Sequence, residues 1–427
     1  MPTALSLHAR TTCRVCPEDI PLTTVIDLGE ICVSAFPRSP SIDPLRAPLR
    51  LGRCPTCTLV QLFETVSPEV LYGRQYWYKS GVNEVMVEEL KSVVLMAMAR
   101  LPLGLDPGDR VLDIGANDGT LLSFYPDIAH RVAVEPSPMF ADALRLRADV
   151  VHERFFPSET IDRFRPGGSQ YNAITSIASF YNVEDPNAYV HAIKELLAPH
   201  GIWIIQLQDL LGMLEQTAFD NICHEHVEYY TLYSLQQLLR INQLTIWDVE
   251  PRAINGGSLR LYVGHGEHEP AWARTHHILD QLAREDSADL MNDRLIPQIF
   301  LRFMDQIGHH RSMFRALLQH AKARGPIDGY GASTKGNTLF QVFDIDHTDI
   351  RQIAERSPEK VGRVTVKSNI PIVSEETWRE DPAPLTIVPI WQFRKAVIQR
   401  EAEYLKSGGA FAFPLPSMEI VTSKSSR

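Results

Sequence analysis

Four cysteines near the start of the chain have the spacing of a metal site. Cys13 and Cys16 form one Cys-x-x-Cys pair, and Cys54 and Cys57 form a second. Each pair can place two thiolates on one side of a tetrahedral ion, as in structural zinc sites. Two chance pairs of buried thiols are the alternative, and a disulfide framework is disfavoured because nothing else in the sequence is typical of a secreted protein. Four protein ligands leave no open position, so we predict a zinc ion that holds the fold together and takes no part in chemistry.

A second chemical motif is the apolar stretch Arg110–Ile114, which runs into a turn containing Gly115 and Gly119. Glycines at such a turn let the backbone approach a ligand closely. The next predicted strand ends at Glu135, which follows Asp113 by 135 − 113 = 22 residues. A carboxylate at this position can accept hydrogen bonds from both ribose hydroxyls of an adenosine-containing ligand.

Two details favour S-adenosylmethionine over NAD as that ligand. The turn at residues 115–119 lacks the G-x-G-x-x-G pattern that brings the backbone close to a pyrophosphate. Asp113 can meet the ammonium group of a methionine moiety, whereas it would repel a phosphate. A degenerate Rossmann-like unit that binds nothing is the alternative. The cofactor-binding residues predicted here are Asp113, Gly115, Asn117, Glu135 and Ser179.

The sequence His224-Glu225-His226 lies beyond a predicted buried strand at residues 202–207. Ligands of open α/β sheets bind outside the carboxyl ends of the strands, so a methyl acceptor would meet the cofactor here. Two imidazoles and a carboxylate can supply a base and a group that orients it. A structural cluster and a metal site stay open as alternatives. The metal site is disfavoured because the i, i+4 spacing of zinc proteases and a third ligand are both missing.

The rest of the chain indicates a multidomain α/β protein. Its 427 residues suffice for two or three domains, and the net charge of −10 argues against a nucleic-acid partner. No apolar run approaches a membrane span and no signal peptide is evident, so we expect no membrane partner and a cytoplasmic location. Strands and helices alternate from about residue 105 to 265, which is typical of a parallel sheet with crossover helices.

The predicted domains follow from this alternation. We expect a zinc-binding domain at residues 1–66, and a central class I (Rossmann-like) methyltransferase domain at 67–266, beginning with a Tyr-rich loop and a helix. A helical connector at 267–322 and a C-terminal Rossmann-like α/β domain at 323–427 complete the chain.

The C-terminal domain contains its own glycine turn, at residues 329–336. It is not a P-loop, because the G-K-[ST] ending is absent. Backbone N–H groups at a helix start, together with Lys335, would suit a phosphate. Glu355 follows Gly331 by 355 − 331 = 24 residues, where a ribose-binding acid would lie. A purely structural lobe is the alternative.

These motifs, with Gly256-Gly257-Ser258-Leu259-Arg260, occur here in one order. From about residue 10 to 418, the chain resembles the three-domain sugar C-methyltransferases that act on nucleotide-linked 4-keto-6-deoxyhexoses. The resemblance implies that a base removes the proton next to the 4-keto group and that the resulting enolate carbon attacks the methyl group of S-adenosylmethionine.

The resemblance also implies the roles of individual residues. His226 would be the base and Glu225 its support, while Tyr76 and Tyr78 would hydrogen-bond the enolate or relay the proton. The residues expected to bind the sugar nucleotide are His224, Cys223, Tyr330, Lys335 and Arg394.

The chain departs from the family at two positions. Cys223 stands where members often have tyrosine, and Gln206 where many have glutamate. The first departure leaves open whether the tyrosine role falls to Tyr76 or Tyr78, or whether the methylated carbon differs. Two alternative functions remain: an O- or N-methyltransferase acting on a nucleotide sugar, and a non-catalytic sugar-nucleotide binding protein.

Overall fold

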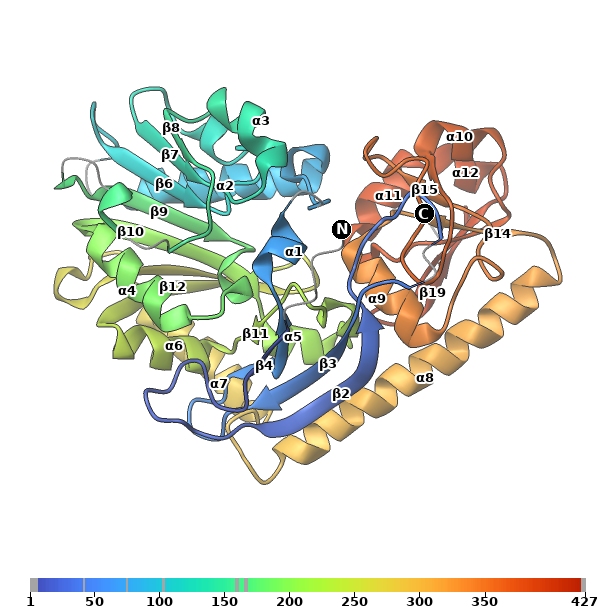
Figure 1. Cartoon of the computed structure of the whole chain (residues 1–427), viewed down its shortest axis with the longest axis horizontal. Helices are drawn as coiled ribbons and strands as arrows, with labels where there is room; N and C mark the ends of the chain where they lie inside the picture. Colours follow the sequence, from blue (N-terminus) through green and yellow to red (C-terminus); the bar gives the residue numbers. More distant parts are fainter. Residues whose placement is uncertain are drawn as a thin grey trace.

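The computed structural model describes residues 7–40, 43–73, 76–101, 104–157, 161–164 and 168–423. The central unit and the C-terminal unit stand side by side in Figure 1, and the N-terminal strands lie beneath and between them. Within the described ranges, no helix is both long and apolar enough to cross a membrane.

The N-terminal domain is built from short antiparallel strands. β1 (Leu7–Ala9) pairs with β5 (Glu64–Val66). β2 (Thr23–Cys32), β3 (Arg46–Arg53) and β4 (Val60–Leu62) form a second sheet, to which the central domain adds a fourth strand, β11 (Glu228–Tyr229). The strand that directly follows the His-Glu-His segment therefore belongs to the sheet of the N-terminal domain.

The central domain is a seven-stranded sheet with the order β12-β13-β10-β9-β6-β7-β8. Only β13 runs antiparallel to its neighbours. Strands β9 and β10 are buried and apolar along most of their length, as expected for parallel strands covered on both faces. The strands are β6 (Arg110–Ile114), β7 (His130–Val134), β8 (Val150–His152), β9 (Tyr171–Ile177), β10 (Leu197–Gln208), β12 (Leu244–Arg252) and β13 (Ser258–His265).

Helices flank this sheet, and one of them follows the Tyr-rich segment. That helix, α2, has Asn83 as its N-cap, whose side chain accepts a hydrogen bond from the Val85 N–H. The helices of this domain are α2 (Glu84–Arg100), α3 (Ala141–Arg145), α4 (Pro186–Leu196), α5 (Leu210–Glu215) and α6 (Leu232–Ile241). The preceding helix α1 (Pro68–Tyr72) packs on the N-terminal domain, where Leu71 shares an apolar cluster with Val33 and Val66.

The connector consists of two helices, α7 (Thr275–Ser287) and α8 (Ile296–Lys322), separated by residues 288–295. Helix α8 runs from beneath β2 to the C-terminal unit (Figure 1). Its buried face carries Phe300, Phe303, Ile307, Phe314 and Leu318, which share one apolar core with residues of the N-terminal and C-terminal sheets. The N-terminal and C-terminal domains are therefore packed into one body.

The C-terminal domain is a six-stranded sheet with the order β16-β15-β14-β17-β18-β19, parallel except for its last strand. The strands are β14 (Ile327–Tyr330), β15 (Ile353–Glu355), β16 (Ile372–Ser374), β17 (Leu385–Ile387), β18 (Ala410–Phe413) and β19 (Glu419–Val421). The helices are α9 (Thr334–Phe343), α10 (Glu375–Glu380), α11 (Arg394–Arg400) and α12 (Ala402–Lys406). The predicted α/β fold with two Rossmann-like domains is confirmed.

Candidate active site and zinc centre

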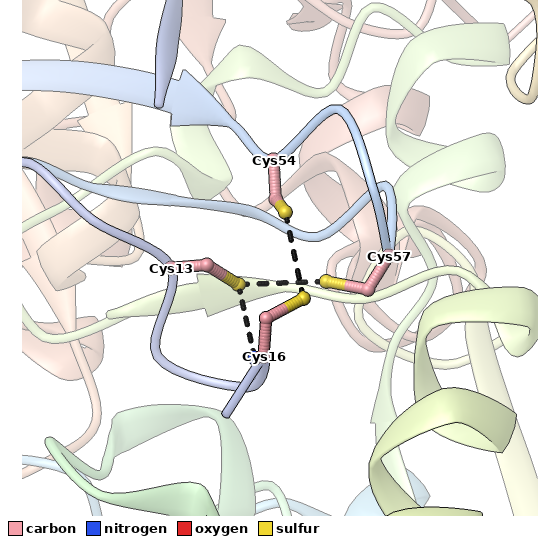
Figure 2. Close-up of side chains that lie close together, drawn as sticks. All are labelled: Cys13, Cys16, Cys54 and Cys57. Carbon is pink, nitrogen blue, oxygen red and sulfur yellow. Dashed lines mark hydrogen bonds between the residues drawn. The ribbon is translucent and has the colours of Figure 1, made fainter. Parts of the chain in front are cut away.

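The four predicted metal ligands converge on one point. Figure 2 shows their sulfur atoms facing one another, with Cys13 Sγ 3.5 Å from Cys57 Sγ and Cys16 Sγ 3.8 Å from Cys54 Sγ. All four sulfurs lie within 4.8 Å of one another. A tetrahedron with Zn–S bonds of about 2.3 Å has edges of about 3.8 Å, whereas a disulfide would need about 2.05 Å. The cluster therefore fits zinc and excludes disulfides.

The zinc cluster is linked to the catalytic loop candidate through Arg14 and Gln61. The Gln61 side chain donates to Cys13 Sγ at 3.6 Å and accepts from the Arg14 N–H at 3.0 Å. The Arg14 guanidinium donates to the Leu62 carbonyl at 2.8 Å, and its Nε lies 3.9 Å from Glu228 Oε1 with both side chains buried. The metal site and residues 223–229 thus belong to one connected network.

Strand β11 holds the His-Glu-His segment against the N-terminal domain. Glu228 pairs with Gln61 in register, and the Leu62 N–H donates to the Val227 carbonyl at 2.9 Å. His224 points into this interface, where its Nε2 lies 3.2 Å from the Ala47 carbonyl oxygen. Its neighbour His226 faces the other way, into a cavity of about 220 Å³.

This central cavity brings together most of the residues predicted for chemistry and cofactor binding. The candidate catalytic residues that line it are Tyr76, Tyr78, Glu225 and His226. The candidate cofactor residues that line it are Gly115, Asn117, Glu135 and Ser179. Lys335, which we expected at a phosphate in the C-terminal domain, also lines this cavity.

Glu135 is held by two backbone hydrogen bonds and keeps acceptor capacity for a ligand with two hydroxyl groups. Its Oε2 accepts the Asn117 N–H at 2.9 Å and its Oε1 accepts the Ser137 N–H at 2.8 Å. Burial raises the pKa of this carboxyl, while the two backbone donors lower it. Each oxygen of a carboxylate can accept more than one hydrogen bond, so both can still receive a ribose hydroxyl.

Gly115 is required by a close packing contact as well as by its backbone conformation. Its φ is +77°, and a Cβ there would lie 2.7 Å from Ser179 Cβ. The Ser179 hydroxyl donates to the Ile114 carbonyl at 2.9 Å, which draws the loop after β9 against the glycine turn. A side chain at residue 115 would therefore push apart two walls of the cavity.

The Tyr-rich segment is fastened to the cofactor turn by its backbone. Asn117 donates to the Tyr78 carbonyl at 2.9 Å and accepts from the Ser80 N–H at 2.9 Å. The Gly81 N–H donates to Asp118 Oδ2 at 3.0 Å. These bonds carry Tyr76 and Tyr78 to the cavity wall and occupy the Asn117 side chain.

Asp113 does not line the central cavity. It lies behind the turn, where the Thr175 hydroxyl donates to its Oδ1 at 2.6 Å. Burial raises the pKa of Asp113 to about 7. The position suits a carboxyl group that supports the turn, so its predicted contact with an ammonium group stays a prediction.

His226 has the tautomer and the protonation state of a base. The Asn221 carbonyl lies 2.7 Å from its Nδ1, so Nδ1 carries the proton and Nε2 keeps a free lone pair. Burial, reinforced by the positive charge of Lys335, lowers the pKa of His226 to about 3. The ring is therefore neutral at physiological pH. Tyr181 packs edge-on against it, with ring centroids 4.7 Å apart.

Glu225 presents an unsatisfied carboxyl group to the same cavity. The residue is nine-tenths buried, and no group in the described ranges hydrogen-bonds its Oε2. Burial raises the pKa of Glu225. The Tyr72 hydroxyl donates to the Glu225 backbone carbonyl at 2.6 Å, which fixes the loop without using Oε2 of the carboxyl group. Such an orphaned polar atom in a cavity points to a ligand partner.

Cys223 is fully buried beside Glu225 and does not line the central cavity. Burial and the neighbouring Glu225 carboxyl raise the pKa of its thiol well above the usual range. It is therefore a protonated thiol behind the cavity wall. Residue 223 brings no phenol to the site, but the side chains of Tyr72, Tyr76, Tyr78 and Tyr181 line the cavity.

A second cavity, of about 150 Å³, lies at the C-terminal domain and has Tyr78 in its wall, as the central cavity does. We call it the C-terminal cavity. Four cationic side chains line it, against the two carboxylates Glu355 and Glu375. The cations are Lys79, Arg356, Lys360 and Arg400. The excess of positive charge suits an anionic ligand such as a phosphate ester.

Glu355 resembles Glu135 in accepting hydrogen bonds from two backbone N–H groups, but it also accepts the Arg356 N–H at 2.8 Å and lies 3.5 Å from Lys360 Nζ. Its Oε2 accepts the Ala332 N–H from the glycine turn at 2.9 Å, and its Oε1 accepts the Ser357 N–H at 2.9 Å. The two Rossmann-like domains therefore each hold one carboxylate at the end of their second strand, where it accepts one N–H from the glycine turn and one from the residue two positions further along the chain. Each lies where a ribose-binding acid is expected in such a domain.

Two predicted substrate residues are engaged elsewhere. The Tyr330 hydroxyl lies 2.7 Å from both Glu375 Oε1 and Glu401 Oε1, so although Tyr330 borders the C-terminal cavity its hydroxyl is already bound. Arg394 forms a two-pronged ion pair with Glu419 and lines neither cavity.

Sequence analysis missed Tyr72, Tyr181 and Asn182 as cavity residues. The signal for the last two was available, because both follow strand β9, the parallel neighbour of the cofactor strand β6. Residues directly after such a strand border the ligand crevice of an open α/β sheet. Nothing in the sequence places Tyr72, which reaches Glu225 only through the folding of the N-terminal domain.

Three family models match the chain in succession. A model described as a zinc binding domain matches residues 13–72, a methyltransferase domain matches 86–249, and a C-methyltransferase C-terminal domain matches 253–416. The C-methyltransferase NovU of Streptomyces niveus is 26% identical over 380 residues, which cover 88% of each chain.

Solved structures resemble the chain over a smaller share. A S-adenosylmethionine-dependent methyltransferase from Clostridium acetobutylicum aligns with a TM-score of 0.34 and 14% identity, over 42% of this chain and 92% of its own. The CurJ carbon methyltransferase aligns with a TM-score of 0.33 and 17% identity, over 44% of this chain and 57% of its own.

Proposed function

Because this chain belongs to the three-domain, zinc-containing C-methyltransferases that use S-adenosylmethionine, we propose that it methylates the carbon next to the keto group of a nucleotide-linked 4-keto-6-deoxyhexose. The observation that carries the proposal is the pair of matched carboxylates, Glu135 and Glu355, in adjoining cavities. One ribose site serves the cofactor, and the second calls for another nucleotide, the handle of the substrate.

The charge of the C-terminal cavity supports a diphosphate on that second nucleotide. Its four cationic side chains exceed its two carboxylates, and a sugar nucleotide brings two negative charges. Because both cavities border Tyr78, a sugar attached to the diphosphate extends toward His226 and Glu225. A cytoplasmic location belongs to the same proposal, since zinc thiolates persist where disulfides do not form.

His226 is the base in this proposal. The Asn221 carbonyl fixes the Nδ1 proton, so Nε2 accepts the proton from the carbon next to the keto group. The C–H electron pair forms a carbon–carbon double bond and the keto oxygen becomes an enolate. Tyr76 keeps its proton, because burial and nearby carboxyl groups raise its pKa well above the usual range, and it can donate that proton in a hydrogen bond to the enolate.

S-adenosylmethionine, when bound, supplies a methyl group on a positively charged sulfur. Glu135 orients its ribose, and the close contact between Gly115 and Ser179 keeps the adjoining cavity walls in place. The enolate carbon takes the methyl group, the carbonyl re-forms, and the sulfur keeps the electron pair of the broken bond. The proton stays on His226 until the product leaves.

Product analysis tests the proposal. The chain is incubated with a dTDP-4-keto-6-deoxyhexose and S-adenosylmethionine carrying a 13C methyl group, and the product is examined by carbon NMR. We expect the label in a methyl group bonded to ring carbon C3 or C5. A label bonded to oxygen or nitrogen, or no product despite binding of both ligands, would reject the proposal.

A further inference from the structure

We propose that Lys335 is the cation that binds the enolate oxygen, so that the C-terminal domain completes the active site of the central domain. This inference rests on the function proposed above. It assigns to Lys335 a contact with the reacting group, in place of the phosphate contact that the glycine turn at residues 329–336 suggests.

The position of α9 carries the first part of the argument. Thr334 and Lys335, the first two residues of this helix, line the central cavity together with Glu225 and His226. The preceding residue, Ser333, caps the helix by accepting the Gly336 N–H at 2.9 Å, and it borders the C-terminal cavity instead. The first turn of α9 therefore lies between the two cavities: Ser333 borders the C-terminal cavity, and Lys335 borders the central cavity with His226.

The phosphate role is supplied by other residues. Lys79, Arg356, Lys360 and Arg400 line the C-terminal cavity, whereas Lys335 does not. A diphosphate held beside Glu355 therefore has its own counter-charges. The Lys335 ammonium is therefore available to a different anion. In the proposed reaction that anion is the enolate, which forms in the central cavity.

The amino group of Lys335 is oriented without being neutralised. It donates to the Asn255 carbonyl at 3.2 Å, at the tip of the hairpin between β12 and β13. No carboxylate of the described residues lies within ion-pair distance of it. An ammonium group has three N–H donors, so two remain for a ligand.

A buried carboxyl group, that of Asp220, favours the charged form of Lys335. Asp220 is fully buried, and Trp391 Nε1–H donates to its Oδ2 at 2.9 Å. Burial lowers the pKa of Lys335, and the charge of Asp220 acts against that shift. The positive charge of Lys335 is felt at His226, whose pKa it lowers. The charge of Lys335 therefore acts directly on the proposed base, His226.

This charge matches what enolate formation requires. In the resting site the positive charge opposes protonation of His226, whose ring is neutral. Once the keto oxygen becomes negative, it offsets the charge of Lys335, so His226 can hold the proton at lower cost. When the C–H bond breaks, the electron pair moves onto the keto oxygen, and Lys335 donates a hydrogen bond to the negative charge that develops there. A preorganised donor in a dry cavity stabilises such a charge much more than water does.

Two variants test the inference through hydrogen exchange. The chain is mixed with a dTDP-4-keto-6-deoxyhexose in deuterated water without S-adenosylmethionine, and deuterium next to the keto group is followed by proton NMR. We expect exchange in the wild type, a loss of about 100-fold or more in Lys335→Met, and retention of at least about a tenth in Lys335→Arg. Arginine keeps the charge but cannot serve as a base.

The controls separate the possible failures. Lys395→Met, which removes an exposed lysine of the same domain, should exchange like the wild type. Binding of S-adenosylmethionine and of the dTDP-sugar is measured by calorimetry on each variant, and folding by circular dichroism. Normal exchange in Lys335→Met, equal loss in the arginine variant, or a loss explained by weaker dTDP-sugar binding would overturn the role of Lys335 alone. A wild type that binds the dTDP-sugar but does not exchange it would overturn the proposed function as well.

Discussion

Removal of the zinc ion should abolish turnover, although the metal lies outside the central cavity. A structural zinc site contributes about 10–16 kcal/mol of apparent folding free energy. The whole stability of a typical domain is about 5–15 kcal/mol. The N-terminal sheet has few strands, and its strand β4 begins only three residues after the ligand Cys57. We therefore expect this sheet to unfold when the metal is removed.

The effect on chemistry follows from strand β11. Loss of β4 removes the register pairs of Glu228 and Tyr229 and the hydrogen bond from Leu62 to the Val227 carbonyl. His226 then loses its anchor on the C-terminal side. A displacement of about 1 Å at a reacting group costs roughly 100-fold in rate, so we expect at least that loss. S-adenosylmethionine binding should change much less, because Glu135 and Gly115 lie on strands and turns of the central domain.

The assay combines chelation with a pair of matched cysteine variants. Cys16→Ser removes a ligand, whereas Cys32→Ser changes a buried cysteine of the same domain that lies outside the cluster. Zinc content, turnover and hydrogen exchange at residues 223–230 are measured for both. We expect the first variant alone to lose metal, turnover and protection. Normal turnover in a zinc-free chain would refute the reasoning.

Further predictions concern single residues. His226→Ala should lower turnover by about 100-fold or more while calorimetry still detects S-adenosylmethionine, and near-normal turnover would remove His226 as the base. Burial lowers the pKa of His226 to about 3. Below about pH 6.5 the unfolded chain therefore takes up a proton that the native state does not, and the free energy of unfolding decreases as the pH is lowered. The native state of the wild type should therefore lose up to about 2 kcal/mol more than that of His226→Gln between pH 7.5 and 5 in urea unfolding, and equal losses would contradict the assigned burial. Glu355→Gln should weaken dTDP binding by about tenfold, a loss of about 1.4 kcal/mol, and leave S-adenosylmethionine binding unchanged, whereas Glu135→Gln should do the reverse; a shared effect on both ligands would refute the assignment of one ribose to each domain.

Several features of the site could be predicted because they depend on local sequence. The Cys-x-x-Cys pairs predict their own metal, since thiolates two residues apart already face one side of an ion. The stretch Arg110–Ile114 and its glycine turn predict a cofactor strand, because a buried apolar strand that ends in a glycine turn lets a ligand approach the backbone at the strand end. The helix that follows this turn is only a short 3-10 helix, Leu122–Phe124. These predictions of fold and cofactors are confirmed.

The side chains of the His-Glu-His segment were harder to assign. His224 and His226 are two residues apart, yet one faces the Ala47 carbonyl and the other lines the central cavity. Their directions are set by the pairing of β11 with β4, which begins about 170 residues earlier in the chain. Sequence patterns on the loop contain no trace of that pairing.

The sequence by itself determined the zinc ligands and the two α/β units, because each depends on residues close together in the chain. It also predicts one carboxylate for a ribose in each unit. Only the tertiary structure decided which cavity each side chain serves. Lys335 belongs to a glycine turn of the kind that can bind a phosphate. However, α9 packs against the segment before the His-Glu-His loop, and this packing places Lys335 in the wall of the central cavity. A side chain near a domain boundary can face either domain, and contacts between residues distant in sequence make that choice.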